Sequence, residues 1–160
     1  SGVSARDISD GLSNTIAFSE RLIGDRNASH YTPSRDWAYS TSLIQSAGQP
    51  PLLPDDTAQR CRSGVTSVQK HASFCGVGWL FGRFGTTSYN HILPPNSPVP
   101  DCSPPNGGSG AFSARSYHIG GVYCLLADGA VTFVSDSIDV AVWRAAGTIN
   151  GRETSTISQN

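Results

Sequence analysis

The stretch VYCLLADGAVTFV, residues 122–134, decides the fold of this chain. Two apolar runs flank Asp128-Gly129, and strand–Asp-Gly–strand is the strongest short-range signal for a β-hairpin. A two-residue turn requires a positive φ at both Asp128 and Gly129. It places Leu126 opposite Val131, and both faces of the hairpin are then largely apolar. We therefore expect these strands to be covered on both sides or to lie deep in a sheet.

A short helix is predicted directly after the hairpin. Ser137 is a good N-cap, and Asp139 lies in the first turn, where the helix dipole favours a carboxylate. Gly147 is well placed to end the helix in the left-handed conformation. The apolar stripe of this helix consists of Ile138, Val142 and Ala146. We expect Trp143 to pack against the hairpin and residues 150–160 to form a flexible tail.

The rest of the chain predicts short strands and long loops. Residues 15–22 favour a strand over a competing helix, because Thr, Ile and Phe prefer strands. Residues 24–73 are a long polar stretch with one short strand around Trp37 and Tyr39, and residues 75–93 form a second strand region. Residues 94–100 are a proline-rich surface loop, because proline lacks the donor that a central strand needs.

The fold class follows from these segments. We expect an α+β, mainly β fold, with an antiparallel sheet, long loops and a short C-terminal helix, in a single domain over residues 1–149. The 17 Gly and 10 Pro fit such a chain better than a helical bundle.

Composition excludes several function classes. The net charge is −1 and charged residues make up 14% of the chain, so the basic footprint of a nucleic-acid binder is missing. No apolar run approaches the roughly 18 residues of a membrane span. The sequence has no G-x-S-x-G elbow, no H-E-x-x-H motif and no phosphate-binding glycine loop in a βαβ context. We expect no enzymatic activity and no required cofactor.

Four cysteines, Cys61, Cys75, Cys102 and Cys124, form no C-x-x-C pair, which makes a structural zinc site improbable. An even count in a loop-rich chain favours disulfides over free thiols, and an oxidising compartment. Three pairings are open. Short loops cost the least entropy to close, which favours Cys61 with Cys75 and Cys102 with Cys124.

Several stretches carry a family resemblance. His118 and Asp128-Gly129 have the spacing H-x9-D-G. Residues 10–15 with Glu20 read D-G-x-S-N-T…E, and residues 90–96 read N-x(2)-L-P-P-N. In this order they resemble a planctomycete-type family of unassigned function, whose members begin with a prepilin-type cleavage and methylation helix like that of pseudopilins. The motif residues are His118, Asp128, Gly129, Asp10, Gly11, Ser13, Asn14, Thr15 and Glu20.

The resemblance implies a pilin- or pseudopilin-like globular head, from the C-terminal half of a longer family member. It implies an extracytoplasmic structural subunit in a bacterial surface filament or secretion apparatus. Its partners would be other subunits or the missing N-terminal half. The alternative is a glycan- or protein-binding module, in which long loops present aromatic side chains. The residues for that alternative are Trp37, Tyr39, Tyr89 and His91.

The motif residues have two interpretations. The simpler one is structural: His118 fixes the entry to the hairpin, and Asp128 and Gly129 supply turn geometry. The second is a structural calcium site of the kind that pseudopilins can carry, because carboxylate and amide oxygens suit calcium. The candidate ligands are Asp7, Asp10, Asn14 and Glu20, although their spacing does not match an EF-hand.

Overall fold

The computed structural model describes residues 2–64, 70–105, 109–153 and 157. They form an α+β fold with more strands than helices, which confirms the predicted class. One antiparallel sheet has the order β1-β5-β6, and the other has the order β3-β2-β4, in which β2 pairs with β3 antiparallel and with β4 parallel. The strands are β1 (Ile16–Ser19), β2 (Trp37–Tyr39), β3 (His71–Ala72), β4 (Asp101–Ser103), β5 (Gly121–Leu126) and β6 (Val131–Ser135).

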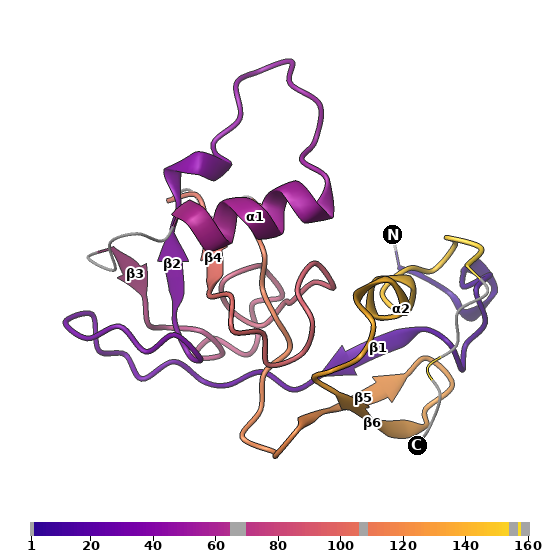
Figure 1. Ribbon diagram of the computed structural model, residues 1–160. Coiled ribbons are helices and arrows are strands. Elements are labelled where there is room, and N and C mark those ends of the chain that lie inside the picture. Colours follow the sequence, from indigo (N-terminus) through magenta and orange to yellow (C-terminus); the bar gives the residue numbers. More distant parts are fainter. Residues whose placement is uncertain (1, 65–69, 106–108, 154–156, 158–160) are drawn as a thin grey trace.

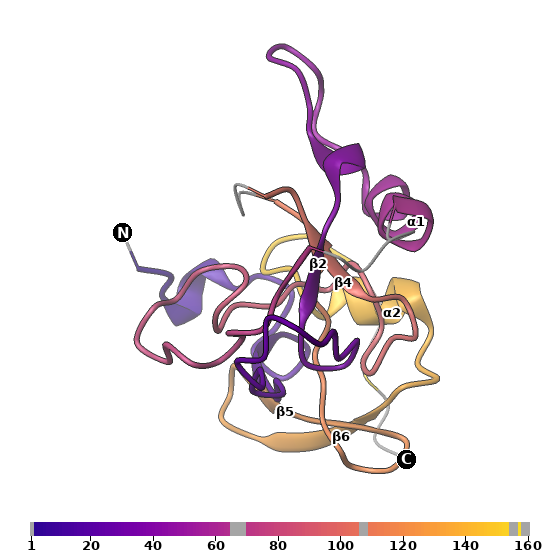
Figure 2. The same cartoon turned by 90° about the vertical axis from the view of Figure 1, so that its left-hand side faces the viewer.

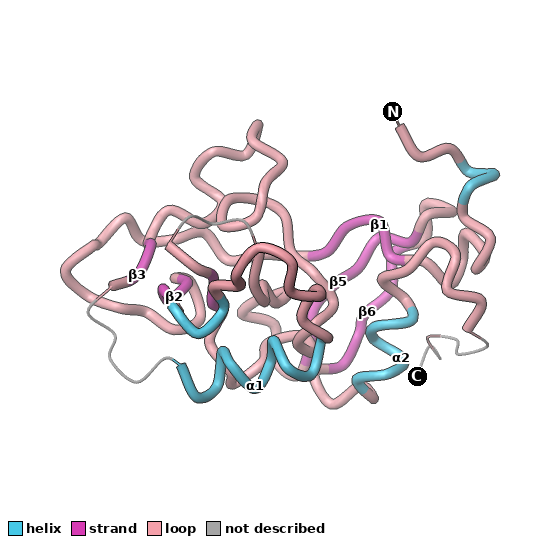
Figure 3. Tube along the Cα trace, turned by 90° about the horizontal axis from the view of Figure 1, so that it is seen from above, coloured by secondary structure: helices cyan, strands magenta, loops and turns pink. Residues whose placement is uncertain are grey.

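Each sheet has its own helix. The helix α2 (Val140–Ala145) lies beside β1-β5-β6, and α1 (Pro54–Gly64) lies next to β2 and β4 (Figure 1). Figure 3 shows β2 and β3 at one end of the molecule and β5, β6 and α2 at the other. Two short 3-10 helices, Ala5–Asp7 and Thr41–Leu43, complete the described elements. The chain after Thr41–Leu43 projects away from β5 and β6 before it enters α1 (Figure 2).

The predicted hairpin is present, but its predicted register is wrong. Leu125, not Leu126, pairs with Val131. The loop has three residues instead of two: the Gly129 amide donates to the Leu126 carbonyl at 3.0 Å, and the Leu126 amide donates to the Ala130 carbonyl at 2.8 Å. Only Gly129, with φ of 92°, is left-handed, whereas Asp128 is not. This is the pattern of a turn followed by a glycine bulge, which shifts one strand by one residue.

The shifted register separates a buried face from an exposed one. Val122, Cys124 and Val134 are each at most 1% exposed and pack with Trp143 of α2. The opposite face is apolar but uncovered in the described part of the chain. The hairpin is covered on one side only in the described part of the chain, and β6 is an edge strand, so the prediction that the hairpin is covered on both sides or lies deep in a sheet is wrong.

The helix α2 confirms the predicted C-terminal helix, but it begins and ends at other residues than predicted. Its N-cap is Asp139, whose carboxylate accepts from the amides of Ala141 and Val142, so the predicted cap Ser137 lies outside it. Trp143 is fully buried and donates its indole N–H to a carbonyl. Gly147 is not left-handed. A Cβ there would meet the His91 ring at 2.4 Å, so close packing requires the glycine.

Two other predictions about local structure are wrong, and one helix was missed. Residues 75–93 contain turns, not strands, with left-handed Gly76 and Gly85 among them. The stretch 94–100 is not a surface loop throughout, because Ser97 and Val99 are buried. The helix α1 was not predicted.

The part of the predicted tail that the structure describes is bound to the rest of the protein. The backbone amides of Gly151 and Arg152 donate to the Asp10 carboxylate, so residues 150–153 do not form a free tail. The remaining tail prediction falls mostly on residues 154–156 and 158–160, which lie outside the described residues.

Candidate functional site

The structure brings two of the motif residues together beside the sheet β1-β5-β6. Glu20 follows β1, and His118 lies just before β5. The His118 Nε2 is 3.2 Å from the Glu20 Oε1, and the Tyr123 amide donates to the Glu20 Oε2 at 2.7 Å. The His118 ring also contacts the Tyr123 ring edge-on, with centroids 5.2 Å apart. These contacts place the His118 side chain beside the first half of β5.

A hollow of about 450 Å³ opens beside this pair. His118 is half exposed there, with 53% of its side chain accessible to solvent. In the hollow, the Ser116 hydroxyl donates to the Gly121 carbonyl at 2.8 Å and accepts from the His118 amide at 3.1 Å. Its lining residues are Glu20, Arg21, Leu22, Arg115, Ser116, Tyr117 and His118.

A buried charge cluster lies next to the hollow. The Arg21 Nη1 is 2.9 Å from Asp101 Oδ2, and the Arg115 Nη2 is 2.9 Å from Asp101 Oδ1. The Ser113 amide also donates to Asp101 Oδ1, at 3.0 Å. All three charged side chains are at most 8% exposed. Because Asp101 is in β4 while Arg21 and Arg115 flank β1 and β5, this cluster ties the two sheets together.

The Asp10 motif forms a second structural centre. Its carboxylate accepts from the amides of Gly151 and Arg152 at 2.8 Å and from the Thr148 hydroxyl at 2.9 Å. The hydrogen bonds from Arg152 and Gly151 hold the pKa of Asp10 below its usual value. The Asn14 amide nitrogen donates to the Asp10 carbonyl at 3.0 Å. This carboxylate fixes the segment that follows α2.

The remaining residues of that motif build a loop against the hairpin. Gly11 is left-handed, and the Asn14 amide closes a turn onto its carbonyl, with Ser13 exposed at the tip. The Ala127 amide donates to the Thr15 carbonyl at 2.8 Å, and the Asp128 amide donates to the Leu12 carbonyl at 3.2 Å. The D-G-x-S-N-T motif therefore lies against the Asp128-Gly129 turn.

The four candidate calcium ligands do not form one site. Asp7 holds the amide and hydroxyl of Ser4 at 2.8 and 2.7 Å, and Asp10 and Glu20 have the partners described above. Asn14 uses its amide nitrogen, not its oxygen, towards Asp10. Within residues 2–64, 70–105, 109–153 and 157, no three His, Cys, Asp or Glu side chains gather to hold a metal.

The four aromatic residues of the binding-module alternative do not form a surface platform. Trp37 is 4% exposed and packs edge-on against Tyr39 and Phe112. The His91 ring stacks on Trp143 with centroids 4.0 Å apart, and its Nδ1 donates to the Trp143 carbonyl at 2.6 Å. Burial lowers the pKa of His91 to about 4.

Tyr89 belongs to the same stack, at 5.3 Å from His91 and 6.4 Å from Trp143 between ring centroids. These residues were predicted to be presented by long loops, and nothing in the local sequence shows that Trp37, Tyr89 and His91 pack into the interior instead.

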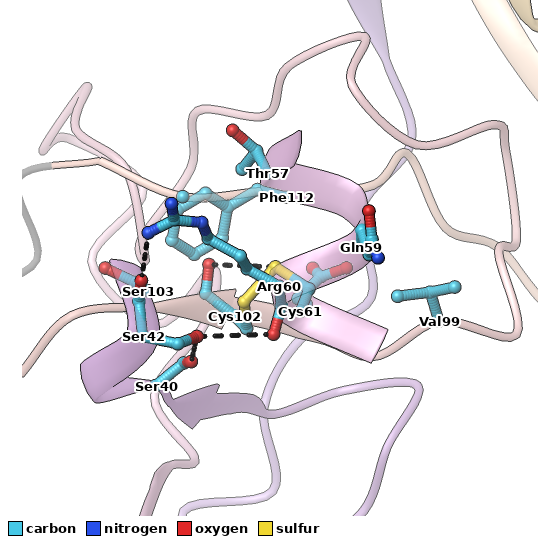
Figure 4. The surroundings of a disulfide bond; sticks show 12 residues. Ser40, Ser42, Thr57, Gln59, Arg60, Cys61, Val99, Cys102, Ser103 and Phe112 are labelled. Carbon is cyan, nitrogen blue, oxygen red and sulfur yellow. Dashed lines mark hydrogen bonds between the residues drawn. A yellow bond between two sulfur atoms is a disulfide. The ribbon is translucent and has the colours of Figure 1, made fainter. Parts of the chain in front are cut away.

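The disulfide pairing predicted from loop length is wrong. Cys61 of α1 bonds to Cys102 of β4 (Figure 4), with Cα atoms 5.6 Å apart. Cys75 and Cys124 are buried free thiols, in different core clusters. Burial raises the pKa of the Cys124 thiol to about 11, so it is unreactive at neutral pH. The reason for the error is α1, which was not predicted and which carries Cys61 onto the second sheet.

Hydrogen bonds support the disulfide from the neighbouring 3-10 helix. The Arg60 guanidinium donates to the Ser42 carbonyl at 2.6 Å (Figure 4). The Ser40 amide donates to the Ser103 carbonyl at 2.8 Å. A disulfide fits a protein of an oxidising, non-cytoplasmic compartment. Neither helix in the described part of the chain has the length and apolar character needed to span a bilayer.

A family model described as SBP_bac_10, protein of unknown function (DUF1559), matches residues 1–141. The chain belongs to this family. No curated protein and no solved structure matches it. The resemblance to a family of unassigned function is thus confirmed at this level. The prepilin-type signal and the H-x9-D-G signature stay predictions.

Proposed function

We propose that this member of the DUF1559 family is an assembly subunit: a pilin- or pseudopilin-like extracytoplasmic head of a bacterial surface filament or secretion apparatus. In this proposal the outer face of the sheet β1-β5-β6, the side opposite α2, packs against another protein subunit. The observation that carries it is the apolar character of that exposed face.

The outer face consists of neighbouring large apolar side chains on all three strands. Phe18 is 69% exposed, Val131 is 64% exposed and Phe133 is 41% exposed. The register places Phe18 opposite Leu125 and Leu125 opposite Val131, so one row crosses the whole sheet. The uncovered face of an antiparallel sheet is normally polar. A contiguous exposed apolar face is typical of a protein interaction site.

The loop before β5 extends this face. Tyr117 is 74% exposed and Ile119 is fully exposed. Tyr123, on the outer face itself, is 46% exposed and pairs with Phe133. The Glu20–His118 pair lies beside Tyr123 and supplies a polar border. Aromatic side chains at the centre of an interface with polar groups around them are the usual composition of a strong protein contact.

The motif residues support a structural function over a catalytic one. The Asp10 carboxylate is occupied by backbone amides, and the Asp128 Oδ1 accepts from the Ala130 amide at 2.9 Å. We therefore expect no turnover that depends on Asp10, Asp128 or His118.

Site-specific photo-crosslinking in the native host tests the assembly function. A photoreactive amino acid placed at Phe18 or Phe133 in the full-length protein should give crosslinks to a protein subunit, seen as discrete bands of higher mass. The matched control position is Ile44, which is 58% exposed and lies outside the sheet. Crosslinking at Phe18 and Phe133 no stronger than at Ile44 would contradict the proposal.

A further inference from the structure

A second exposed apolar surface lies on the turns that follow β3. Trp79, Leu80 and Phe81 are consecutive, and 80%, 76% and 64% of their surfaces are exposed. We name these three residues the apolar tip. No described residue buries them. Exposed large apolar residues in a run are uncommon on a soluble protein and mark an interaction site.

The tip is held in shape by its own hydrogen bonds. The Phe81 amide donates to the Gly78 carbonyl at 2.8 Å, which closes a tight turn. The Phe81 carbonyl accepts from the hydroxyls of Thr86 and Thr87 at 2.6 and 2.8 Å. A Cβ at Gly78 would be 2.8 Å from the Phe81 ring, so glycine allows the ring to lie against the turn. A preorganised tip loses little entropy on binding.

The base of the turns is anchored in the core. Phe84 stacks on the buried Phe112 with centroids 5.7 Å apart, and Phe74 contacts Trp37 edge-on at 6.3 Å. The tip therefore presents its side chains from a fixed support.

The size of the tip favours insertion over docking to a flat protein surface. A large side chain offers about 150–250 Å² of apolar surface, so the three residues expose roughly 450 Å². A partner in a standard protein–protein interface contributes about 800 Å². A convex tip of this size is too small for such an interface but large enough to enter the boundary between lipid headgroups and acyl chains, where Trp is enriched.

The charges around the tip suit a phospholipid surface. No Asp or Glu occurs between Asp56 and Asp101, while Arg83 is exposed two residues after the tip. An exposed arginine near an apolar tip is attracted to lipid phosphates.

We propose that Trp79, Leu80 and Phe81 insert into the interfacial region of a phospholipid bilayer, with Arg83 against the headgroup phosphates. The inference is independent of the assembly function, which uses the outer face of the other sheet.

Vesicle flotation and tryptophan fluorescence test the proposal on the 160-residue chain. The probes are phosphatidylcholine vesicles with and without phosphatidylglycerol. Trp37 and Trp143 are 4% and 0% exposed, so a blue shift on binding reports Trp79. We expect the protein to float with the vesicles, and brominated acyl chains to quench the shifted emission.

Variants locate the contact. The triple substitution Trp79→Ser, Leu80→Ser, Phe81→Ser should raise the lipid concentration for half-binding by at least about a hundredfold. Arg83→Glu should weaken binding to the anionic vesicles by about tenfold and weaken binding to phosphatidylcholine, whose phosphate is balanced by choline, by less. The matched control, Phe18→Ser, Ile119→Ser, Val131→Ser, removes three equally exposed apolar residues elsewhere and should bind as the unsubstituted chain does.

Three results would each overturn the proposal. The first is that the unsubstituted chain does not float with either kind of vesicle, and the second is that the tip variant binds as well as the control variant. The third is that the tip drives self-association in sedimentation without vesicle binding, which assigns it to a protein partner. Near-ultraviolet circular dichroism of each variant establishes that its fold is intact.

Discussion

At the residue scale, Asp101 has the largest energetic consequence. It is the carboxylate that pairs with two buried guanidiniums, those of Arg21 and Arg115, and removal of one partner from a buried ion pair leaves uncompensated charge in the interior. We expect Asp101→Asn, which keeps the shape, to lower the free energy of unfolding by about 3–5 kcal/mol. Urea denaturation measures this. The control is Asp55→Asn, because Asp55 is 87% exposed and pairs with Arg144 at the surface.

A surface pair contributes about 1 kcal/mol at most. If Asp101→Asn and Asp55→Asn lower the free energy of unfolding by the same amount, the cluster does not hold the two sheets together.

His91 makes stability depend on pH. Its pKa is lowered to about 4 by burial, whereas the unfolded chain has the ordinary value of 6.5. Between these values the unfolded state binds the proton and the native state does not, so stability falls as the pH is lowered from 6.5 towards 4. The contribution of this one group approaches about 1.4 kcal/mol per pH unit. Urea midpoints from pH 7 to pH 5 measure it.

His91→Asn keeps a donor near the Trp143 carbonyl and removes the titrating group, so its pH dependence should be shallower than that of the unsubstituted chain. The control, His118→Asn, changes a half-exposed imidazole. If the stability of the unsubstituted chain and that of His91→Asn fall equally steeply as the pH is lowered, the pH dependence comes from other groups.

At the element scale, the hairpin depends on one glycine. A residue with a side chain costs about 1–2 kcal/mol in the left-handed conformation that Gly129 adopts. We expect Gly129→Ala to lower the free energy of unfolding by this amount. The control is Gly82→Ala, because an added Cβ there meets nothing within 4 Å and Gly82 has no positive φ. Thermal denaturation of both variants measures this. If Gly82→Ala lowers the unfolding midpoint more than Gly129→Ala does, the three-residue loop is contradicted.

The elements that the sequence predicted are those with strong local patterns. The two apolar runs and Asp-Gly predict β5 and β6, and the apolar stripe predicts α2. The helix α1 was missed although Asp55 and Asp56 in its first turn favour a helix N-terminus. Its sequence is polar, and within residues 54–63 Cys61 and Thr57 are the buried residues, so no apolar periodicity marks the helix.

The candidate site was predicted in part for the same reason. The motif spacing brought out Glu20 and His118, which do meet. Nothing local distinguishes Asp101, Arg21 and Arg115 from surface charges, because their contact exists only once the two sheets have packed. A three-residue strand such as β4 has no pattern of its own.

At the whole-molecule scale, we expect the fold to be independent of calcium. The carboxylates proposed as ligands are engaged by protein groups, as for Asp10 with two backbone amides. Addition of EGTA, or of millimolar calcium, should leave the thermal unfolding midpoint unchanged. The positive control is reduction of the Cys61–Cys102 disulfide, which should lower the thermal unfolding midpoint. A calcium-dependent rise in the midpoint would restore the metal interpretation.

The pairing of β1 with β5 has a consequence for biosynthesis. Ile16 pairs with Leu126, so β1 has no strand partner until β5, far later in the sequence, has been made. Non-local pairing of this kind is slow to form. While the protein is being made, β1 and its exposed Phe18 must therefore stay accessible to chaperones until β5 emerges, and a product that ends before β5 would leave β1 as a target for proteases.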